Sequence, residues 1–89
     1  MSSMRLAFSS DGVRPLTALA EQDRGVIVEV RRTSEGRADR LLALGVTPGA
    51  SVTLLQRFPG IVFLCDQTEL AVERDVAEAV LVRPLEART

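Results

Sequence analysis

The amino-acid sequence predicts a mainly β fold, a small and strongly bent barrel of about five strands with one short inserted α-helix. Short apolar segments follow one another along the chain, separated by turn signals such as Pro48-Gly49 and Pro59-Gly60. Only one segment, residues 35–45, has the three-then-four apolar spacing of an amphipathic helix. The 89 residues leave room for a single domain and no second core.

The N-terminal part predicts an arm, one helical turn and the first strand. Residues 1–14 are Ser-rich and are expected to form the arm, either as a tail or as an edge strand through residues 6–8. Leu16 and Leu19 predict the helical turn. The strand follows at 25–32, with one face made of Val26, Val28 and Val30 and an opposite face, Ile27 and Glu29, that is only partly exposed to solvent.

Residues 34–57 carry a separate signal at each junction of a helix, a turn and a strand. Ser34 is the expected N-cap, because its hydroxyl can accept a bond from an amide of the first turn. Gly45 supplies the left-handed residue that ends the helix, and Val46 is expected to fold back onto Leu41 in a Schellman motif. Residues 47–50 fit a type II turn that leads into the strand 51–57. The buried face of the helix is expected to gather Ala38, Leu41, Leu42 and Gly45.

The C-terminal half predicts three further strands. Residues 58–60 form a compact turn before the continuous apolar run 61–65, which predicts a strand with both faces covered or with one face used for interaction. An exposed edge on that strand would pair with a second copy, so a clean monomer in sedimentation at high concentration would exclude this homo-oligomer. The remaining elements are a strand at 68–73, a helical turn at 74–78, a strand at 79–83 and a C-terminal tail at 84–89.

The helix–turn segment contains the run Arg-Leu-Leu-Ala-Leu-Gly-Val-Thr-Pro-Gly at residues 40–49. Residues 15–19 and 24–28 lie upstream as a Leu-x-x-Leu segment and a Gly-hydrophobic strand, and residues 70–82 lie downstream. In order and spacing, these three parts resemble the FeoA family, the small cytosolic accessory proteins of bacterial ferrous iron transport. The resemblance spans residues 15 to 82.

The resemblance implies an SH3-like barrel over residues 15–83, with the helix inserted after its first strand. Two loops depart from the family pattern. Many relatives have Pro-Gly where this chain has Glu21-Gln22, and the connection 58–60 is shorter than usual. Both departures concern local loop contacts more than the fold.

The composition excludes most catalytic chemistry. The chain has no His, the commonest general base and transition-metal ligand, and it has no Gly-rich phosphate loop or nucleophile elbow. The single cysteine, Cys65, lies inside an apolar run and is expected to be a small core residue. A metal would have to bind carboxylates such as Glu69, Glu73 and Asp75, which we interpret as solvated residues. We therefore expect no enzyme, no cofactor and no metal site.

Charge and hydropathy restrict the partners and the compartment. The formal net charge is −1, and the eleven basic residues, all Arg, are spread along the chain, so a nucleic-acid partner is not expected. No apolar run is long enough for a signal peptide or approaches the ~18 residues of a membrane span. We expect a cytoplasmic protein without direct membrane insertion.

Two surfaces are candidate partner-binding sites. The first is the exposed side and C-terminal end of the helix, where Leu44 flanked by Arg would act as an anchor; the alternative places Leu44 in the core. The second is the tip formed by residues 58–61, which needs cover from the N-terminal arm or from another molecule. The candidate residues are Arg37, Arg40, Leu44, Val46, Phe58 and Ile61.

The resemblance implies a non-enzymatic adaptor that binds the cytoplasmic GTPase region of a FeoB-type transporter and modulates it. The alternative is a metal-responsive regulatory domain related to the barrel of iron-dependent repressors of the diphtheria toxin repressor type. Such barrels normally follow a DNA-binding helical region, which does not fit into 89 residues. An RNA-binding barrel would need a basic, aromatic face, and the chain has three Phe and no Tyr or Trp.

Overall fold

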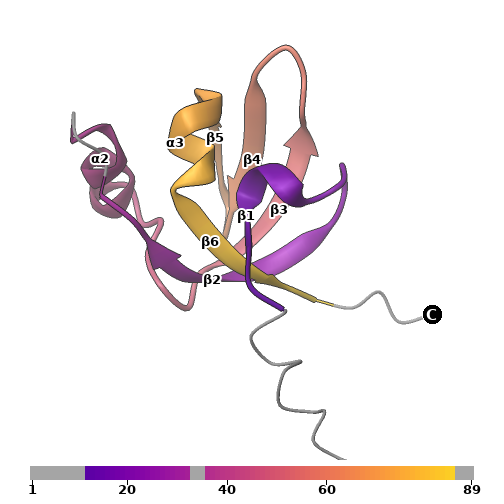
Figure 1. Ribbon diagram of the computed structural model, residues 1–89, viewed down its shortest axis with the longest axis horizontal. Helices are drawn as coiled ribbons and strands as arrows, with labels where there is room; N and C mark the ends of the chain where they lie inside the picture. The colour runs from indigo at the N-terminus through magenta and orange to yellow at the C-terminus, as the bar shows by residue number, and fades with distance from the viewer. Residues whose placement is uncertain (1–11, 33–35, 86–89) are drawn as a thin grey trace, which may run out of the picture.

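One antiparallel sheet of six strands forms the body of the protein, in the order β1-β6-β2-β3-β4-β5 (Figure 1). The computed structural model describes residues 12–32 and 36–85. The elements along the chain are β1 (Arg14–Pro15), η1 (Leu16–Ala18), β2 (Arg24–Val30), α2 (Arg37–Ala43), β3 (Ser51–Gln56), β4 (Ile61–Cys65), β5 (Thr68–Val72), α3 (Arg74–Glu78) and β6 (Val80–Pro84). The mainly β class is confirmed, with one more strand than expected because Arg14 and Pro15 pair with β6. The proposed edge strand at residues 6–8 lies outside the described residues.

The core lies inside the bent sheet and is closed by η1 and α3. Its largest fully buried side chain is Phe63 on β4, and Leu16 of η1 and Val76 of α3 are buried in the same cluster. All buried side chains of the described residues are apolar. Hydrophobic burial is therefore the main force that bends the sheet around its own inner face.

The inner face of β2 carries Ile27 rather than Val26 and Val28. Ile27 is 1% exposed, whereas Val26 and Val28 are half-buried on the outer face. The pairing of β2 with β6 shifts between Ile27 and Glu29, and the extra residue of this bulge brings Val30 back against the core. The strict alternation that we expected for this strand is thus wrong, because it does not account for the bulge.

Strand β4 occupies an interior position of the sheet. It pairs with β3 on one side and with β5 on the other, so both of its edges are used. The strand therefore has no free edge that could pair with a second copy of the protein, as we considered from the sequence. Ile61, Phe63 and Cys65 face the core, while Val62 and Leu64 are half-buried on the outer face. The edge strands of the described sheet are β1 and β5.

The end of α2 has the predicted Schellman geometry. Gly45 has a φ of 98°, its N–H donates to the Leu42 carbonyl at 3.1 Å, and the Val46 N–H donates to the Leu41 carbonyl at 2.9 Å. Leu41 and Val46 are both buried in the core. The type II turn is confirmed as well, because Gly49 has a φ of 96° and the Ala50 N–H donates to the Thr47 carbonyl at 3.0 Å.

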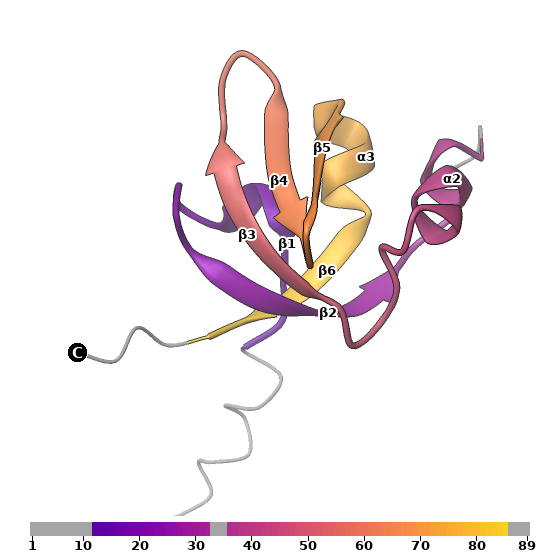
Figure 2. The ribbon, with the colours of Figure 1, turned by 180° about the vertical axis from the view of Figure 1, so that it is seen from behind.

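The start and the inner face of α2 differ from the prediction. The N-cap position is Gly36, with a φ of 72° and no side-chain cap, while Ser34 lies outside the described residues. Leu41 is buried but Leu42 is 42% exposed, and the structure does not describe the side chain of Ala38. Figures 1 and 2 show the reason: α2 stands beside the sheet, so only a narrow stripe of the helix meets the core.

The turn before β2 explains one departure from the family pattern. The Glu21 carboxylate accepts a hydrogen bond from the Arg57 N–H at 3.1 Å, which links this turn to the end of β3. Proline at position 21 would lack that acceptor. Gln22 has a φ of 77°, in the left-handed region that favours glycine.

We expect Gln22→Gly to stabilise the protein by about 1 kcal/mol, because a left-handed conformation costs an L-residue roughly 1–2 kcal/mol and part of that gain is lost to the greater freedom of glycine when unfolded. The Gln22 N–H, which donates to the Leu54 carbonyl at 2.7 Å, is kept in the variant. Urea unfolding measures the change. Gln67→Gly, at an exposed turn position without a positive φ, is the control and should bring no gain. Equal or lower stability of Gln22→Gly would contradict the expectation.

Candidate docking groove beside the edge strand

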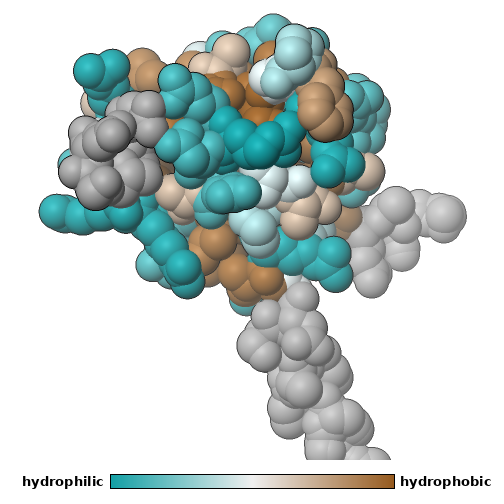
Figure 3. All heavy atoms as spheres, turned by 45° about the horizontal axis from the view of Figure 1, so that its top comes forward, coloured by the Kyte–Doolittle hydropathy of each residue, from teal (hydrophilic) through white to brown (hydrophobic). Residues whose placement is uncertain are grey.

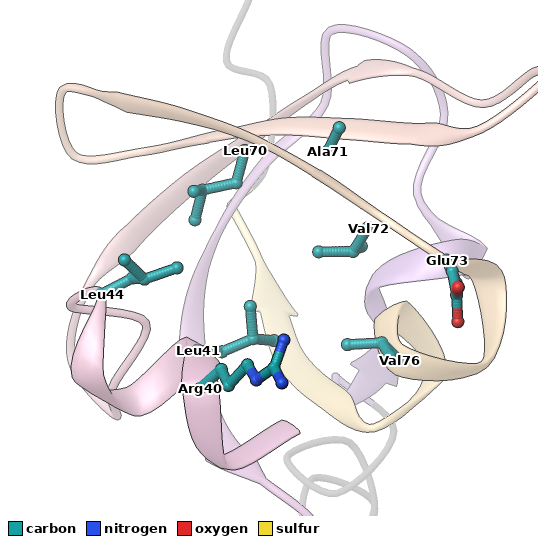
Figure 4. A pocket seen from close by; sticks show the side chains of 8 residues that line it. All are labelled: Arg40, Leu41, Leu44, Leu70, Ala71, Val72, Glu73 and Val76. Carbon is teal, nitrogen blue, oxygen red and sulfur yellow. The ribbon is translucent and has the colours of Figure 1, made fainter. Parts of the chain in front are cut away.

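A groove of about 220 Å³ lies between α2, β5 and α3 (Figure 4). Its deep part is apolar: Leu41 and Val76 are 4% and 5% exposed, and Leu70 and Val72 are partly buried against the core. Leu44, 54% exposed, stands at the rim on the α2 side. The lining residues are Arg40, Leu41, Leu44, Leu70, Ala71, Val72, Glu73 and Val76. This arrangement is suited to binding apolar side chains from another molecule.

The rim carries two side chains of opposite charge. Arg40 projects from α2 into the opening (Figure 4), and Glu73 stands on the other side, at the N-terminal end of α3. Glu73 already takes part in an interaction, whereas Arg40 has no ion pair or hydrogen bond of its side chain to a described residue. Among the described residues, the rim charge that is open to a partner is therefore the positive charge of Arg40.

The structure brings only part of the expected site residues to this groove. Arg40 and Leu44 line it, and Arg37 begins α2, although its side chain is not described. Val46 and Ile61 are both 0% exposed, because the Schellman loop and the inner face of β4 direct them into the core. We correct the expectation for these two residues and leave them out of the docking surface.

Phe58 belongs to a different surface. It lies in the turn between β3 and β4, away from α2 in Figures 1 and 2, and is 73% exposed. The Arg74 guanidinium lies 5.1 Å from the centre of its ring, and the Arg74 Nη2 donates to the Arg57 carbonyl at 3.0 Å. Arg74 of α3 thus contacts this tip, which stays largely exposed, and the N-terminal arm that we considered as its cover lies outside the described residues.

The β5 and α3 side of the groove was not predicted from the sequence. The alternation of Leu70 and Val72 was the available signal, but it indicates only that both residues share one face of a strand. Their partial exposure depends on α2 standing apart from the sheet, so that the residues of an edge strand remain accessible. Figure 3 shows on one face of the molecule that apolar side chains reach the surface in separate patches bordered by hydrophilic residues.

Cys65 and the carboxylates do not form a reactive centre with one another. Cys65 is buried, as expected, and its Sγ–H donates to the Gly45 carbonyl at 3.7 Å, which ties β4 to the end of α2. Burial raises the pKa of this thiol, and the neighbouring charge of Asp66 raises it further, so the nucleophilic thiolate is disfavoured. Within residues 12–32 and 36–85, no three Cys, Asp or Glu residues lie close enough together to hold a metal ion.

The fold and the groove together define a small SH3-like β-domain with a surface suited to binding. Over residues 14–84, the chain matches the model of the FeoA domain. The protein belongs to the FeoA family. A comparison with curated protein sequences gave no match.

Solved structures agree with the family. The crystal structure of an iron uptake regulatory protein, FeoA, is 29% identical, covers 82% of this chain and 99% of its own, and superimposes with a TM-score of 0.71. FeoA of Stenotrophomonas maltophilia, solved with zinc and described as a prokaryotic SH3 domain protein, is 22% identical over 76% of this chain and 87% of its own, with a TM-score of 0.69.

The same fold occurs inside a larger protein. IdeR of T. acidophilum is 22% identical, with a TM-score of 0.70, and the match covers 80% of this chain but 33% of that protein. At this identity, the similarity shows a shared fold alone.

In the described part of our chain, the helices are too short or too polar to cross a membrane.

Proposed function

We propose that this protein is a non-enzymatic, cytoplasmic accessory protein of ferrous iron uptake, which binds the cytoplasmic region of a FeoB-type transporter and modulates it. Membership of the FeoA family supports the pathway, and the FeoA relative described as an iron uptake regulatory protein supports a regulatory role. The observation that carries the proposal is the apolar groove between α2, β5 and α3, with an exposed leucine at its rim and an arginine whose side chain has no partner among the described residues.

Docking would act by changing the balance between conformations of the transporter. A ligand shifts such an equilibrium only by its difference in affinity for the two states. The adaptor therefore has to bind one conformation of the cytoplasmic region more tightly than the other. No reacting group of its own is required for this.

We expect Leu44→Ala to weaken binding of the transporter's soluble cytoplasmic region by about 1–2 kcal/mol, as for a central apolar anchor. Leu42→Ala is the matched control, because Leu42 is a similarly exposed leucine of the same helix, 42% against 54%, and does not line the groove. Isothermal titration calorimetry of both variants and the wild type measures the difference. Equal affinities for the two variants would remove the groove from the docking surface.

A second arm of the experiment tests the alternative surface and the alternative function. A selective loss of affinity in Phe58→Ala would move the docking site to the tip of the β3–β4 hairpin. Amide NMR shifts on adding ferrous iron alone, centred on Glu69, Glu73 and Asp75, would favour a metal-responsive regulatory domain. Shifts confined to the groove on adding the transporter region, with none from iron, would support the adaptor.

A further inference from the structure

One wall of the groove is the backbone edge of a strand. Alternate side chains of a strand point to opposite faces. Leu70 and Val72 of β5 direct their side chains into the groove, whereas the side chain of Ala71 points away from it (Figure 4), so Ala71 lines the groove with its backbone. The groove therefore borders β5 from the side, where the described sheet ends.

The register of β5 identifies the backbone groups that face this opening. A two-residue turn at 66–67 joins β4 to β5, and Cys65 is opposite Thr68, Phe63 opposite Leu70 and Ile61 opposite Val72. Residues of an antiparallel pair alternate between those that exchange backbone bonds and those that do not, and a two-residue turn is closed by a bonded pair. This alternation directs the N–H and C=O groups of Glu69 and Ala71 away from β4, toward the groove.

The open backbone groups of β5 and the size of the groove restrict the conformation of an occupant. A groove of about 220 Å³ has room for one or two side chains, so the backbone of the occupant lies at its rim, where a helix could not pair with β5 because its own N–H and C=O groups are bonded within the helix. An added strand lies only ~4.8 Å from its neighbour and pairs with the open backbone groups. An extended segment with one or two apolar side chains directed toward Leu41 and Val76 fits these limits.

The charge at the rim restricts the composition of that segment. Arg40 reaches into the opening and has no side-chain partner among the described residues, while Glu73 is already engaged. A carboxylate can pair with the planar arginine fork through two hydrogen bonds. An acidic residue beside the apolar ones in the occupant is therefore favoured over a basic one.

We propose that the groove binds an extended, acidic and apolar segment of the transporter's cytoplasmic region, which adds to β5 as a seventh strand of the sheet. This inference rests on the proposed function and goes beyond it in naming the conformation and chemistry of the partner segment. Backbone pairing along β5 supplies the affinity, and the apolar groove and Arg40 select the sequence.

Proline at position 71 tests the strand addition. Ala71→Pro removes an N–H that faces the opening and leaves the bonded positions of β4 and β5 intact, and proline is tolerated on the open side of edge strands. We expect it to weaken binding of the cytoplasmic region roughly tenfold or more. Ala71→Ser is the control: it keeps the backbone N–H at this position and should bind with nearly the affinity of the wild type. Amide spectra and thermal unfolding of each variant establish that it is folded.

Hydrogen exchange on the wild-type protein gives a measurement that needs no variant. Upon binding, the amides of Glu69 and Ala71 should become strongly protected, because they enter a ladder. Chemical shift changes without such protection would overturn the strand addition, since a partner seated on the side chains alone leaves these amides open. If the isolated protein self-associates in sedimentation and the amides of Glu69 and Ala71 are already protected without the transporter region, the strand addition is also overturned, in favour of pairing with a second copy.

The charge assignment has its own test. Arg40→Glu should weaken binding more than Arg40→Gln. Arg40→Lys keeps the positive charge and should therefore bind more tightly than Arg40→Gln at low salt, with a difference that shrinks as salt is added. If the wild type does not bind the cytoplasmic region at all, the proposed function fails and this inference fails with it. If the wild type binds and Ala71→Pro binds equally well, only the strand addition is overturned.

Discussion

Phe63→Ala is expected to lower the free energy of unfolding by about 3–5 kcal/mol, the largest effect of any single change that we predict. Phe63 is 0% exposed and is the largest of the fully buried side chains. It lies on β4 between Leu54 of β3 and Leu70 of β5, so its removal opens a cavity in the middle of the sheet's inner face. An 89-residue domain has a total stability on the order of 4–13 kcal/mol. The loss is therefore a large share of the total stability, and the midpoint of unfolding should fall markedly.

Urea unfolding at 25 °C measures this effect, and the chain offers a matched control. Phe58→Ala removes the same side chain at a position that is 73% exposed. Its ring loses only the contact with Arg74, which is worth about 0.5–1 kcal/mol at an exposed site. Comparable losses in the two variants would show that Phe63 is not the centre of the core.

Gly25→Ala should destabilise the protein by about 2–3 kcal/mol, although it adds a single methyl group. A Cβ at position 25 would lie 2.9 Å from the Arg83 carbonyl oxygen and 3.3 Å from the Pro84 Cα. Both atoms belong to the backbone of β6, so the clash cannot be relieved by rotation of a side chain. It has to be relieved by separating β2 from β6, which Gly25 and Pro84 join in register.

Gly60→Ala is the control for this prediction. A Cβ at position 60 has no neighbour within 4 Å, and Gly60 does not have a positive φ. Its effect should remain within about 0.5 kcal/mol, as for most surface substitutions. Thermal unfolding of both variants measures the difference. A Gly25→Ala protein as stable as Gly60→Ala would mean that β2 and β6 are farther apart than the structure has them.

Elements defined by neighbouring residues could be predicted from the sequence. The Schellman end of α2 at Gly45 and the type II turn ending at Ala50 are confirmed, because their hydrogen bonds join residues no more than five positions apart. The run 61–65 and the segments before and after it were correctly read as strands, but the sequence left open whether both edges of β4 are paired. Strand pairing depends on contacts across the whole chain, which no local pattern specifies.

The candidate site divides in the same way. From the sequence, Leu44 was either an exposed anchor beside the cap or a core residue, and the structure places it, 54% exposed, at the rim of the groove. Val46, only two positions later, turned out to be fully buried, and Leu42 turned out to be exposed. A helical wheel assigns residues to faces, but it does not say which face meets the sheet or how wide the contact is.

By itself, the sequence determined the mainly β class, the position of the helix and its end, and the lack of histidine for catalysis or metal binding. These follow from composition and from interactions within a few residues. Only the tertiary structure decided that β5 is an edge strand of the described sheet, that α2 stands away from it, and that a groove with Arg40 at its rim lies between them. The physical reason is that exposure belongs to the packed molecule: a leucine is core or surface according to which distant segment covers it.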